Sequence, residues 1–373
     1  MTKYPLPETV QSLPRDTSIA LLLSGGVDSA VALHLLVEAG FKPDLFYIRI
    51  GMEDQEGQIT CTAEEDLEMV ALLARKYHLS YQEVDLHKDY WERVVSYTLN
   101  SVKAGLTPNP DMMCNKFIKF GVFHERVGCH YDYTASGHYA STEVVNGKVY
   151  LATAPDPVKD QTDFLAQMNL RQISHVLFPL GCLNKHEVRE IALEANLPNA
   201  LRKDSQGICF LGKIDYNQFV KQHLGTKKGK IIELETGKEL GEHEGYWFHT
   251  IGQRKGLKLS GGPWFVVKKD CPRNVLYVSR GYDPLTQYGT KIYCQEIDFI
   301  TENLFATSSS PLQITFKVRH TPEFTKGVLH KLENGYLIES EKPIQGIAPG
   351  QFAVIYDTDS RLCFGSGPIE RGE

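Results

Sequence analysis

The chain has 373 residues, a length that predicts two or three domains at roughly 150 residues per domain. With 42% hydrophobic and 23% charged residues it resembles an ordinary globular protein, and no apolar run approaches the ~20 residues of a membrane helix. The N-terminus lacks a signal-peptide pattern, and the eight cysteines form no CxxC pair, which argues against a secreted disulfide scaffold and against a zinc ribbon. We therefore expect a cytoplasmic, reduced protein with no membrane association.

The net charge of −6 is unevenly distributed along the chain. Residues 201–280 hold 15 Lys and Arg against 8 Asp and Glu, whereas the rest of the chain is acidic. A basic middle of this kind is typical of a module that meets a polyanion, and it is equally typical of a lysine-rich solvated surface. Charge alone leaves both interpretations open.

The first half of the chain alternates strand-like and helix-like segments, which predicts a parallel sheet covered by helices on both faces. Strands are expected at 18–23, 44–50, 81–85 and 132–135, and helices at 30–39, 62–77, 88–104 and from Asn115 onward, after the loop TPNPDMMC. Two Gly-containing motifs, SGGVDS and SGHYA, follow the first and last of these strands. Ligands of such sheets bind at the carboxyl ends of the strands, where both motifs fall.

The pattern changes near residue 210. A helix-like stretch at 214–223 leads into short alternating strands with Gly-rich turns, and from about 288 the strands follow one another closely, with a hairpin turn at Asn334–Gly335. We expect three domains: residues 1–208 with an α/β fold, a small mixed central domain at 209–284 that carries the basic surface, and a C-terminal β-barrel at 285–373.

The motif Ser24-Gly25-Gly26-Val27-Asp28-Ser29 joins an apolar strand to a helix, so its amides can face an anion at the positive helix N-terminus. It contains neither the GK[ST] of a Walker A loop nor GxGxxG. The alternative is an ordinary glycine turn between a strand and a helix. Such a turn does not require all six residues of this motif. The motif resembles the PP-loop of ATP pyrophosphatases, whose members bind ATP, release pyrophosphate and pass AMP to a substrate.

Two cysteines lie in motifs of their own. Cys114 closes the segment NPDMMC just before the helix predicted from Asn115, where the helix dipole would lower the thiol pKa. Cys209 lies 95 residues later in DSQGICF. Either cysteine alone is more often a small buried apolar residue than a nucleophile.

Together with the loop, these segments resemble the tRNA-specific 2-thiouridylase family. The resemblance runs from residue 24 to about 320 and includes NPDxxCNxxIKF at 109–120, GHYA at 137–140, KDQ at 159–161 and DSxGICF at 204–210. It implies a domain of the adenine nucleotide alpha-hydrolase-like fold, followed by a central domain and a barrel. The chain departs from the family pattern at Leu22, at FYIRIG (46–51) and at Asp163.

The resemblance implies ATP-dependent replacement of the C2 oxygen of the wobble uridine by sulfur, in lysine, glutamate and glutamine tRNAs. Transfer of AMP to the C2 oxygen would turn this oxygen from a poor leaving group into a good one. The ATP-binding residues would be Leu22, Leu23, Ser24, Gly25, Gly26, Val27, Asp28, Ser29, Ile48 and Gly137, with Asp28 near a Mg²⁺ ion on the phosphates.

The same resemblance implies roles for the two cysteines. Cys209 would carry the incoming sulfur as a persulfide, received from a cysteine desulfurase or a sulfur relay protein, and Cys114 would act on it to end in a transient Cys114–Cys209 disulfide. Asp111 is the candidate general acid/base toward the uridine. Its alternative is an Asx-turn residue after Pro110.

The tRNA contacts implied by the resemblance come from three segments: the target-base segment Asn109, Pro110 and Asp111, the segment Lys159, Asp160 and Gln161, and the C-terminal pair Arg319 and His320. The basic middle, with Lys227, Lys228, Lys230, Arg254, Lys255 and Lys258, would meet phosphates. A flipped-out wobble base is required, because its C2 cannot be reached while it is stacked. For Arg319 and His320, a strand end facing water is an equally good interpretation.

Three other functions would use parts of the same pattern. Another PP-loop ligase acting on a small molecule would have no use for two cysteines in these motifs or for a basic middle. A non-catalytic RNA-binding protein would not need an intact SGGVDS motif. An iron–sulfur tRNA thiolase would need three or four converging cysteines, for which Cys61, Cys129 or Cys182 would have to join Cys114 and Cys209.

Overall fold

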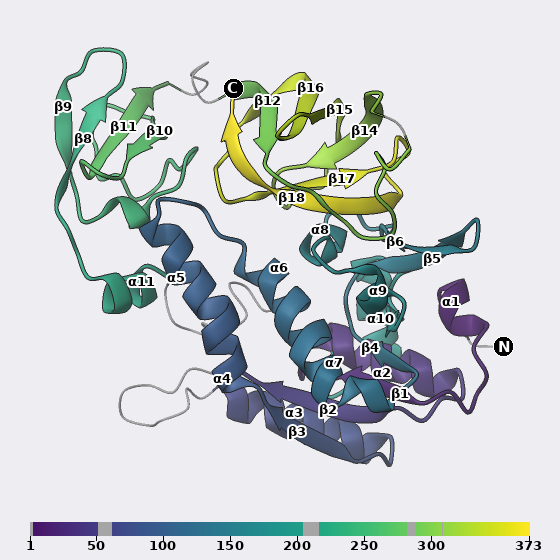
Figure 1. The fold of residues 1–373 in the computed structure, drawn as a ribbon. Coiled ribbons are helices and arrows are strands. Elements are labelled where there is room, and N and C mark those ends of the chain that lie inside the picture. Colours follow the sequence, from purple (N-terminus) through teal and green to yellow (C-terminus); the bar gives the residue numbers. More distant parts are fainter. Residues whose placement is uncertain (1–2, 51–61, 204–215, 282–287, 308) are drawn as a thin grey trace.

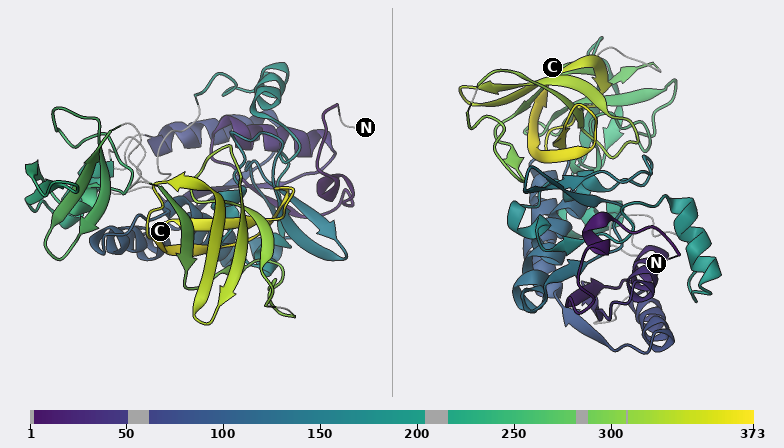
Figure 2. Two further views of the ribbon diagram at one scale, coloured as in Figure 1. Left: turned by 90° about the horizontal axis from the view of Figure 1, so that it is seen from above. Right: turned by 90° about the vertical axis from the view of Figure 1, so that its right-hand side faces the viewer.

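The computed structural model describes residues 3–50, 62–203, 216–281, 288–307 and 309–373, which form three parts (Figure 1). A helix-covered sheet occupies the N-terminal part, a four-stranded sheet the central part, and a barrel the C-terminal part (Figure 1). The barrel lies on one side of the α/β part, as Figure 2 (right) shows. None of the helices in the described ranges has the length and apolar character that a membrane crossing requires.

Five parallel strands form the N-terminal sheet in the order β3-β2-β1-β4-β7. They are β1 (Ile19–Leu22), β2 (Asp44–Arg49), β3 (Tyr81–Asp85), β4 (Tyr133–Ala135) and β7 (Val176–Leu177). Every residue of β1 is buried, as expected for a central strand covered on both faces. The predicted parallel α/β fold is confirmed.

Two apolar clusters cover the two faces of this sheet. Ala20 and Leu22 belong to one cluster, and the intervening residues Ile19 and Leu21 belong to the other, because successive strand residues point to opposite faces. The second cluster includes residues of helices α2 (Val27–Glu38), α3 (Thr62–Lys76) and α10 (Lys185–Glu194). The first includes residues of two long helices, 87–103 and 110–126.

Both long helices contain π-helical turns. The first consists of α4 (His87–Tyr90), the π-helical stretch Trp91–Val95 and α5 (Ser96–Lys103), and the second of α6 (Pro110–Cys114), the π-helical stretch Asn115–Val122 and α7 (Phe123–Arg126). Such turns are frequent at functional sites.

The second helix begins five residues earlier than predicted. Pro110 is its first residue, and the side chain of Asn109 accepts a hydrogen bond from the Met112 amide at 3.1 Å. An Asn cap followed by Pro is a strong signal for the start of a helix. The prediction of a loop ending at Cys114 did not take this signal into account. Cys114 therefore lies inside the helix rather than before its N-terminus. The predicted lowering of the Cys114 thiol pKa by the helix dipole assumed that Cys114 precedes the helix, and this assumption was wrong. The dipole acts on groups in the first turn, and Cys114 lies beyond that turn.

The remaining elements of the N-terminal part are short. They are α1 (Glu8–Gln11), a 3₁₀ turn at Gly128–His130, α8 (Thr162–Leu165), α9 (Leu170–Ile173), and the hairpin of β5 (Ser141–Val145) and β6 (Lys148–Ala152). The hairpin pairs with the last barrel strand, Leu151 lying opposite Cys363, and so extends the barrel sheet. The N-terminal and C-terminal parts therefore share one sheet.

The central part contains α11 (Tyr216–Leu224), a 3₁₀ turn at Tyr246–Phe248 and the strands β8 (Gly229–Glu233), β9 (Glu239–His243), β10 (Trp264–Asp270) and β11 (Val275–Arg280). These strands form a sheet in the order β10-β11-β8-β9 around a small apolar core of its own.

The C-terminal part is a closed barrel, as predicted. Its strands are β12 (Tyr288–Cys294), β14 (Leu312–Lys317), β15 (Thr325–Leu332), β16 (Gly335–Gln345), β17 (Phe352–Tyr356) and β18 (Leu362–Gly372), with the short β13 (Asp298–Phe299) paired to β18. The order β12-β16-β15-β14-β17-β18 returns to β12 through the pairing of β12 with β18. The predicted hairpin between β15 and β16 is present, with Leu332 opposite Gly335.

Candidate functional site

The SGGVDS loop lies at the carboxyl end of β1 and leads directly into α2, whose N-cap is Gly26. Gly25 has a φ of +76°, and a Cβ at this position would lie 2.8 Å from the backbone oxygen of Asp66. A glycine is therefore required for both conformation and space. The first turn of this twelve-residue helix directs its unpaired amides toward the loop, which is the arrangement of an anion site.

Two serine side chains fix the shape of the loop. The Ser24 amide donates to Ser29 Oγ at 3.2 Å, and the Ser29 hydroxyl donates to the Gly26 carbonyl at 3.1 Å. The Gly26 amide is 3.4 Å from Ser24 Oγ. These contacts within the loop fix its conformation.

The second motif, SGHYA, lies against the first. A Cβ on Gly137 would lie 2.7 Å from the Ser29 amide nitrogen, so the backbone after β4 approaches the first turn of α2 as closely as glycine permits. The two motifs predicted to lie at one edge of the sheet are thus adjacent. Burial lowers the pKa of His138, whose Nδ1 lies 2.8 Å from Ser136 Oγ.

Asp28 is the acidic residue of the loop, and two side chains hydrogen-bond to its Oδ1. Lys185 Nζ and the Tyr139 hydroxyl both donate to that oxygen at 2.7 Å. The Lys185 side chain is only 15% exposed, against 33% for Asp28. A half-buried lysine therefore places a positive charge beside the SGGVDS loop.

The loop is also held from its other side. Asn199 Nδ2 donates to the Gly25 carbonyl at 2.9 Å, and Arg202 contacts the same carbonyl at 3.2 Å. Arg202 also pairs with Asp66 of α3 at 2.6 Å. Burial raises the pKa of Asp66, an effect that Arg202 opposes.

Sequence reasoning missed Lys185, Asn199 and Arg202 as parts of this site. Lys185 had a detectable signal: Asn184 and Glu187 form a capping box, which places Lys185 at the first helical position of α10. No comparable local signal marks Arg202, because its partners Gly25 and Asp66 are distant in the sequence.

The other candidate ATP contacts lie along the same edge. Leu22 and Leu23 are buried, and the Leu23 amide donates to the Phe46 carbonyl at 2.8 Å within the sheet. Any ligand contact from these two residues must therefore come from the backbone carbonyls. Ile48 of β2 is partly buried against the first apolar cluster.

Cys114 and Asp111 occupy successive turns of one helix, three residues apart, and so share a face. Cys114 is 1% exposed and belongs to the same apolar cluster as Leu22, the residue at the end of β1. Asp111 Oδ1 is buried without a hydrogen-bond partner among the described residues. Cys209, and with it the proposed Cys114–Cys209 pairing, lies outside the described residues.

Asn109 and Pro110, the other residues of the target-base segment, start the helix. Asn109 caps it, as described above, and its amide lies 3.3 Å from the Tyr97 hydroxyl. Pro110 is buried at the first helical position. These contacts give both residues a structural role in positioning Asp111.

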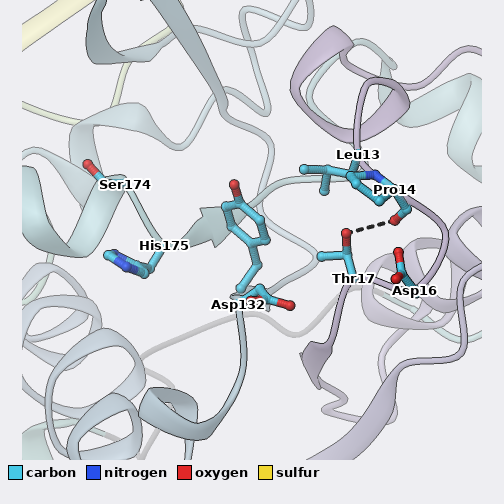
Figure 3. A pocket seen from close by; sticks show the side chains of 8 residues that line it. Leu13, Pro14, Asp16, Thr17, Asp132, Ser174 and His175 are labelled. Carbon is cyan, nitrogen blue, oxygen red and sulfur yellow. Dashed lines mark hydrogen bonds between the residues drawn. The ribbon is translucent and has the colours of Figure 1, made fainter.

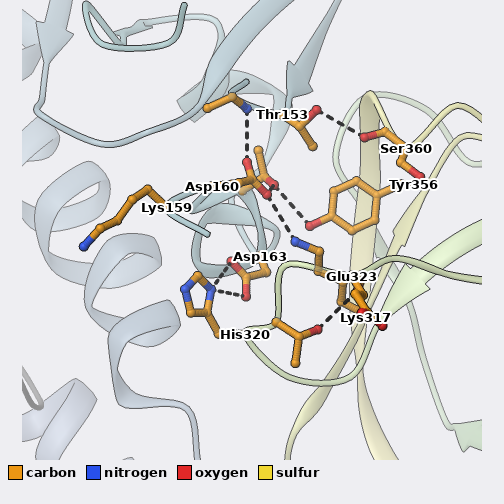
Figure 4. Close-up of polar contacts among 12 residues, drawn as sticks. Thr153, Lys159, Asp160, Asp163, Lys317, His320, Glu323, Tyr356 and Ser360 are labelled. Atoms are coloured by element: carbon orange, nitrogen blue, oxygen red, sulfur yellow. Dashed lines mark hydrogen bonds and ion pairs between the residues drawn. The ribbon is translucent and has the colours of Figure 1, made fainter. Parts of the chain in front are cut away.

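Lys159 and Asp160 lie where the N-terminal part meets the barrel, and their side chains point in different directions (Figure 4). Asp160 and Lys317 form an ion pair of 3.4 Å in which both side chains are 1% exposed. Asp160 also accepts hydrogen bonds from the Ala154 amide and the Thr162 hydroxyl. Its carboxylate therefore joins the N-terminal part to the barrel.

The neighbours of Asp160 face elsewhere. Gln161 Oε1 accepts a hydrogen bond from the Tyr139 amide at 3.0 Å, which ties this segment to the SGHYA motif. The Lys159 side chain points away from the ion pair in Figure 4. The backbone of this turn is set by Asp156, which accepts hydrogen bonds from the amides of Lys159 and Lys185.

Arg319 and His320 are also partly engaged within the protein. Arg319 donates to the carbonyls of Ile251 and Gly346, and so links the central part to the barrel. Burial lowers the pKa of Arg319. His320 Nδ1 lies 3.0 Å from Asp163 Oδ2, and this hydrogen bond raises the pKa of His320.

The basic side chains of the central part that were expected to meet phosphates are exposed. Lys228 and Lys230 pair with Glu242 and Glu239 at 3.7 and 2.7 Å on the β8–β9 hairpin, and Lys227 precedes them. Arg254, Lys255 and Lys258 are exposed on the loop before β10. Exposed pairs of this kind are weak and leave the lysines accessible to phosphates.

A cavity of about 420 Å³ opens at the opposite edge of the parallel sheet (Figure 3). Thr17, Asp132 and His175, which line it, all precede strands. The functional residues of a parallel sheet follow its strands, so this cavity is not the candidate site.

No three His, Cys, Asp or Glu side chains converge on a metal-binding geometry within the described ranges. Cys129 is exposed and Cys182 partly buried, whereas Cys61 and Cys209 lie outside those ranges.

Three family models match successive parts of the chain. Residues 17–213 match a family described as "tRNA methyl transferase HUP domain", residues 217–280 the "tRNA methyl transferase PRC-barrel domain", and residues 290–369 the "Aminomethyltransferase beta-barrel domain". The three matches follow the three parts of the structure.

Full-length relatives are similar to the chain throughout. A protein of Porphyromonas gingivalis named "tRNA-specific 2-thiouridylase MnmA" is 64% identical over 358 residues, covering 95% of this chain and 99% of the relative. A protein of the same name from Parabacteroides distasonis is 61% identical over 351 residues, covering 94% and 98%. Among solved structures, the NMN synthetase of Francisella tularensis is 15% identical, with a TM-score of 0.35 over 57% of this chain and 77% of that one.

Proposed function

This chain belongs to the tRNA-specific 2-thiouridylase family, and from that premise we propose that it is a tRNA-uridine 2-sulfurtransferase that uses ATP to replace the C2 oxygen of the wobble uridine by sulfur. The proposed substrates are lysine, glutamate and glutamine tRNAs, and the proposed location is the cytoplasm. One observation carries the proposal beyond the family membership. The SGGVDS loop follows β1, and Leu22 of that strand belongs to the same apolar cluster as Cys114, which shares a helix with Asp111.

ATP is the group-transfer reagent in this proposal. The residues of the SGGVDS loop would receive the phosphates on the amides of α2, with Lys185 as a fixed cation beside them. Gly137 and the backbone carbonyls at the end of β1 would face the adenosine. Breaking the α–β phosphate bond would release pyrophosphate and leave AMP on the C2 oxygen.

The residues present fit a magnesium ion held mainly by phosphate oxygens. Asp28 offers a carboxylate at the loop, and no cluster of three potential ligands exists in the described ranges that would hold a metal without phosphates. Mg²⁺ is commonly bound by one or two carboxylates together with substrate phosphates, whose charge it neutralises. Asp28 is the residue we assign to it.

Sulfur transfer is proposed to use both motif cysteines. A donor protein, either a cysteine desulfurase or a sulfur relay protein, would leave a persulfide on Cys209. The Cys114 thiol would attack the inner sulfur, forming the Cys114–Cys209 disulfide and releasing the outer sulfur as hydrosulfide. Hydrosulfide would attack C2 and expel AMP, and an external thiol would reduce the disulfide.

Asp111 is proposed to move the proton at the uridine. Its unpartnered buried oxygen supports this role, because a buried carboxylate oxygen without a hydrogen bond is costly unless a ligand completes it. The tRNA contacts are proposed to come from Lys159 and Gln161, from His320, and from the basic residues of the central part. For Asp160 and Arg319 we propose a joining role between domains.

The proposal is tested with purified protein, ATP, Mg²⁺, sulfide and an unmodified lysine tRNA transcript. We expect pyrophosphate release that depends on the tRNA, and one 2-thiouridine per tRNA by nucleoside mass spectrometry. An Asp111→Asn protein should bind this tRNA normally and form little 2-thiouridine. Pyrophosphate release without any thionucleoside would favour another ATP-dependent ligase.

A further inference from the structure

A second cavity, of about 320 Å³, lies between the N-terminal part and the central part. On the N-terminal side it is lined by the segment that connects α5 to α6, including Thr107 and Pro110. On the central side it is lined by Tyr216, Trp247 and Phe248, with His249 beside them. Cavities between domains are common ligand sites.

Hydrogen bonds across the boundary hold the two walls together. The hydroxyls of Thr107 and Thr250 are 2.5 Å apart, and the Tyr246 hydroxyl donates to the Lys103 carbonyl at 2.5 Å. Each bond joins the end of α5, or the loop after it, to the central part. These contacts within the protein fix the shape of the cavity.

The lining is aromatic and carries little charge. Burial lowers the pKa of His249 to about 4, so its imidazole is neutral near pH 7. A ligand that completes this wall offers a flat, uncharged face to the aromatic side chains.

The surroundings of the cavity point to RNA. Pro110 directly precedes Asp111, the residue proposed to move the proton at the target uridine. The loop that supplies His249 and Thr250 continues into Arg254 and Lys255, whose side chains are exposed. An uncharged aromatic cavity next to exposed cations is the arrangement with which proteins bind unstacked bases of single-stranded RNA.

We propose that this cavity binds one unstacked base of the anticodon loop, a nucleotide that flanks the target uridine, by stacking against Trp247 and Phe248. The inference rests on the proposed function, since it takes the target to be the wobble uridine. Flipping that uridine removes its stacking contacts with both neighbours, and a second pocket would compensate for this loss. The volume, at the lower end of the range for ligand pockets, suits one base rather than a longer segment.

The experiment varies the RNA against the wild-type protein. Hairpins of the anticodon stem and loop are made intact, or with an abasic nucleotide on the 5′ side of the target uridine, on its 3′ side, or at the far end of the loop. We expect one flanking abasic site to lower kcat/KM for 2-thiouridine formation by about 10- to 100-fold, and the distant one to have little effect.

Protein variants connect that loss to the cavity. Trp247→Ala should lower kcat/KM on the intact hairpin by a similar factor, and the abasic site should then cause little further loss. Trp247→Phe should keep most of the activity, because it keeps the stacking surface. Trp91→Ala, a control on the helix at 87–103 outside the cavity lining, should leave the abasic penalty at its wild-type size.

Two results would overturn the inference: equal kcat/KM for the intact hairpin and both flanking abasic hairpins, or an undiminished abasic penalty in Trp247→Ala. Neither result touches the proposed function. That function fails separately if the wild-type protein forms no 2-thiouridine on intact tRNA.

Discussion

Lys185 Nζ lies 2.7 Å from Asp28 Oδ1, and the pair joins the first turns of α10 and α2 beside the phosphate loop. The Tyr139 hydroxyl donates to the same carboxylate oxygen. The carboxylate compensates the charge of the half-buried ammonium. The pair thus holds the Lys185 ammonium beside the loop that we propose to bind phosphates.

Replacing Lys185 by Met should slow tRNA-dependent pyrophosphate release by roughly 100-fold, because one fixed positive charge toward the developing negative charge is lost. Tyr139→Phe, the matched control, removes the other hydrogen bond to Asp28 without changing charge and should cost much less. Asp28→Ala should abolish release. All three variants should bind tRNA nearly as the wild type does. If Lys185→Met releases pyrophosphate at the wild-type rate, Lys185 is not part of the site.

Asp160→Ala should destabilise the protein by about 3–5 kcal/mol, because it leaves the Lys317 ammonium buried without its carboxylate. Urea unfolding followed by circular dichroism measures the change. The double variant Asp160→Leu with Lys317→Met should recover most of the loss. Lys148→Ala, which breaks the exposed pair with Glu302, is the control and should cost less than about 1 kcal/mol. A wild-type urea midpoint for Asp160→Ala would contradict the joining role.

The sequence predicted elements whose signals are local. The alternation of strand-like and helix-like segments located β1 to β4, and the SGGVDS motif was correctly expected to lie between β1 and a helix. It failed where partners are distant: nothing near Asp160 in the chain shows that Lys317 lies against it, so the sequence did not predict this buried ion pair. The misplaced start of the Cys114 helix has a different cause, since Asn-Pro-Asp is typical of both turns and helix starts.

His320→Gln should lower the melting temperature more at about pH 6 than at about pH 8.5. The contact with Asp163 raises the pKa of His320 above its usual 6.5, so the folded state favours the charged imidazole. That stabilisation is fully present below about pH 6.5 and is lost as the pH rises through the raised pKa. Thermal melts of both proteins across this range test the assignment, which an equal difference at all pH values would refute.

Reversing the charge of Lys227 and Lys228 should weaken binding of all tRNAs alike and flatten the dependence of log Kd on log salt concentration, because fewer counterions are released. Lys42→Glu with Lys76→Glu is the matched control, since both residues are exposed on the N-terminal part, near the edge of the sheet away from the loop. Filter binding at several salt concentrations gives the slope. An unchanged slope would show that Lys227 and Lys228 lie on a solvated surface and do not contact RNA.

Cys209 should accept sulfur first and Cys114 should act only afterwards, because Cys114 is buried beside Asp111 whereas Cys209 follows Gly207 in a separate motif. A Cys209→Ser protein should take up no radiolabelled sulfur from the donor, and Cys114→Ser should load normally but transfer none to tRNA. Wild-type protein turned over without reductant should accumulate the Cys114–Cys209 disulfide. Tryptic peptides of the Cys209→Ser protein are analysed by mass spectrometry. A persulfide on Cys114 in that protein would show that the proposed order of the two cysteines is wrong.

The most direct test is nucleoside analysis of total tRNA from cells that lack this protein. 2-Thiouridine derivatives should be absent from lysine, glutamate and glutamine tRNAs, and should return with the wild-type gene but not with the Cys114→Ser gene. Unchanged 2-thiouridine in the tRNA of the deletion strain would contradict the central claim.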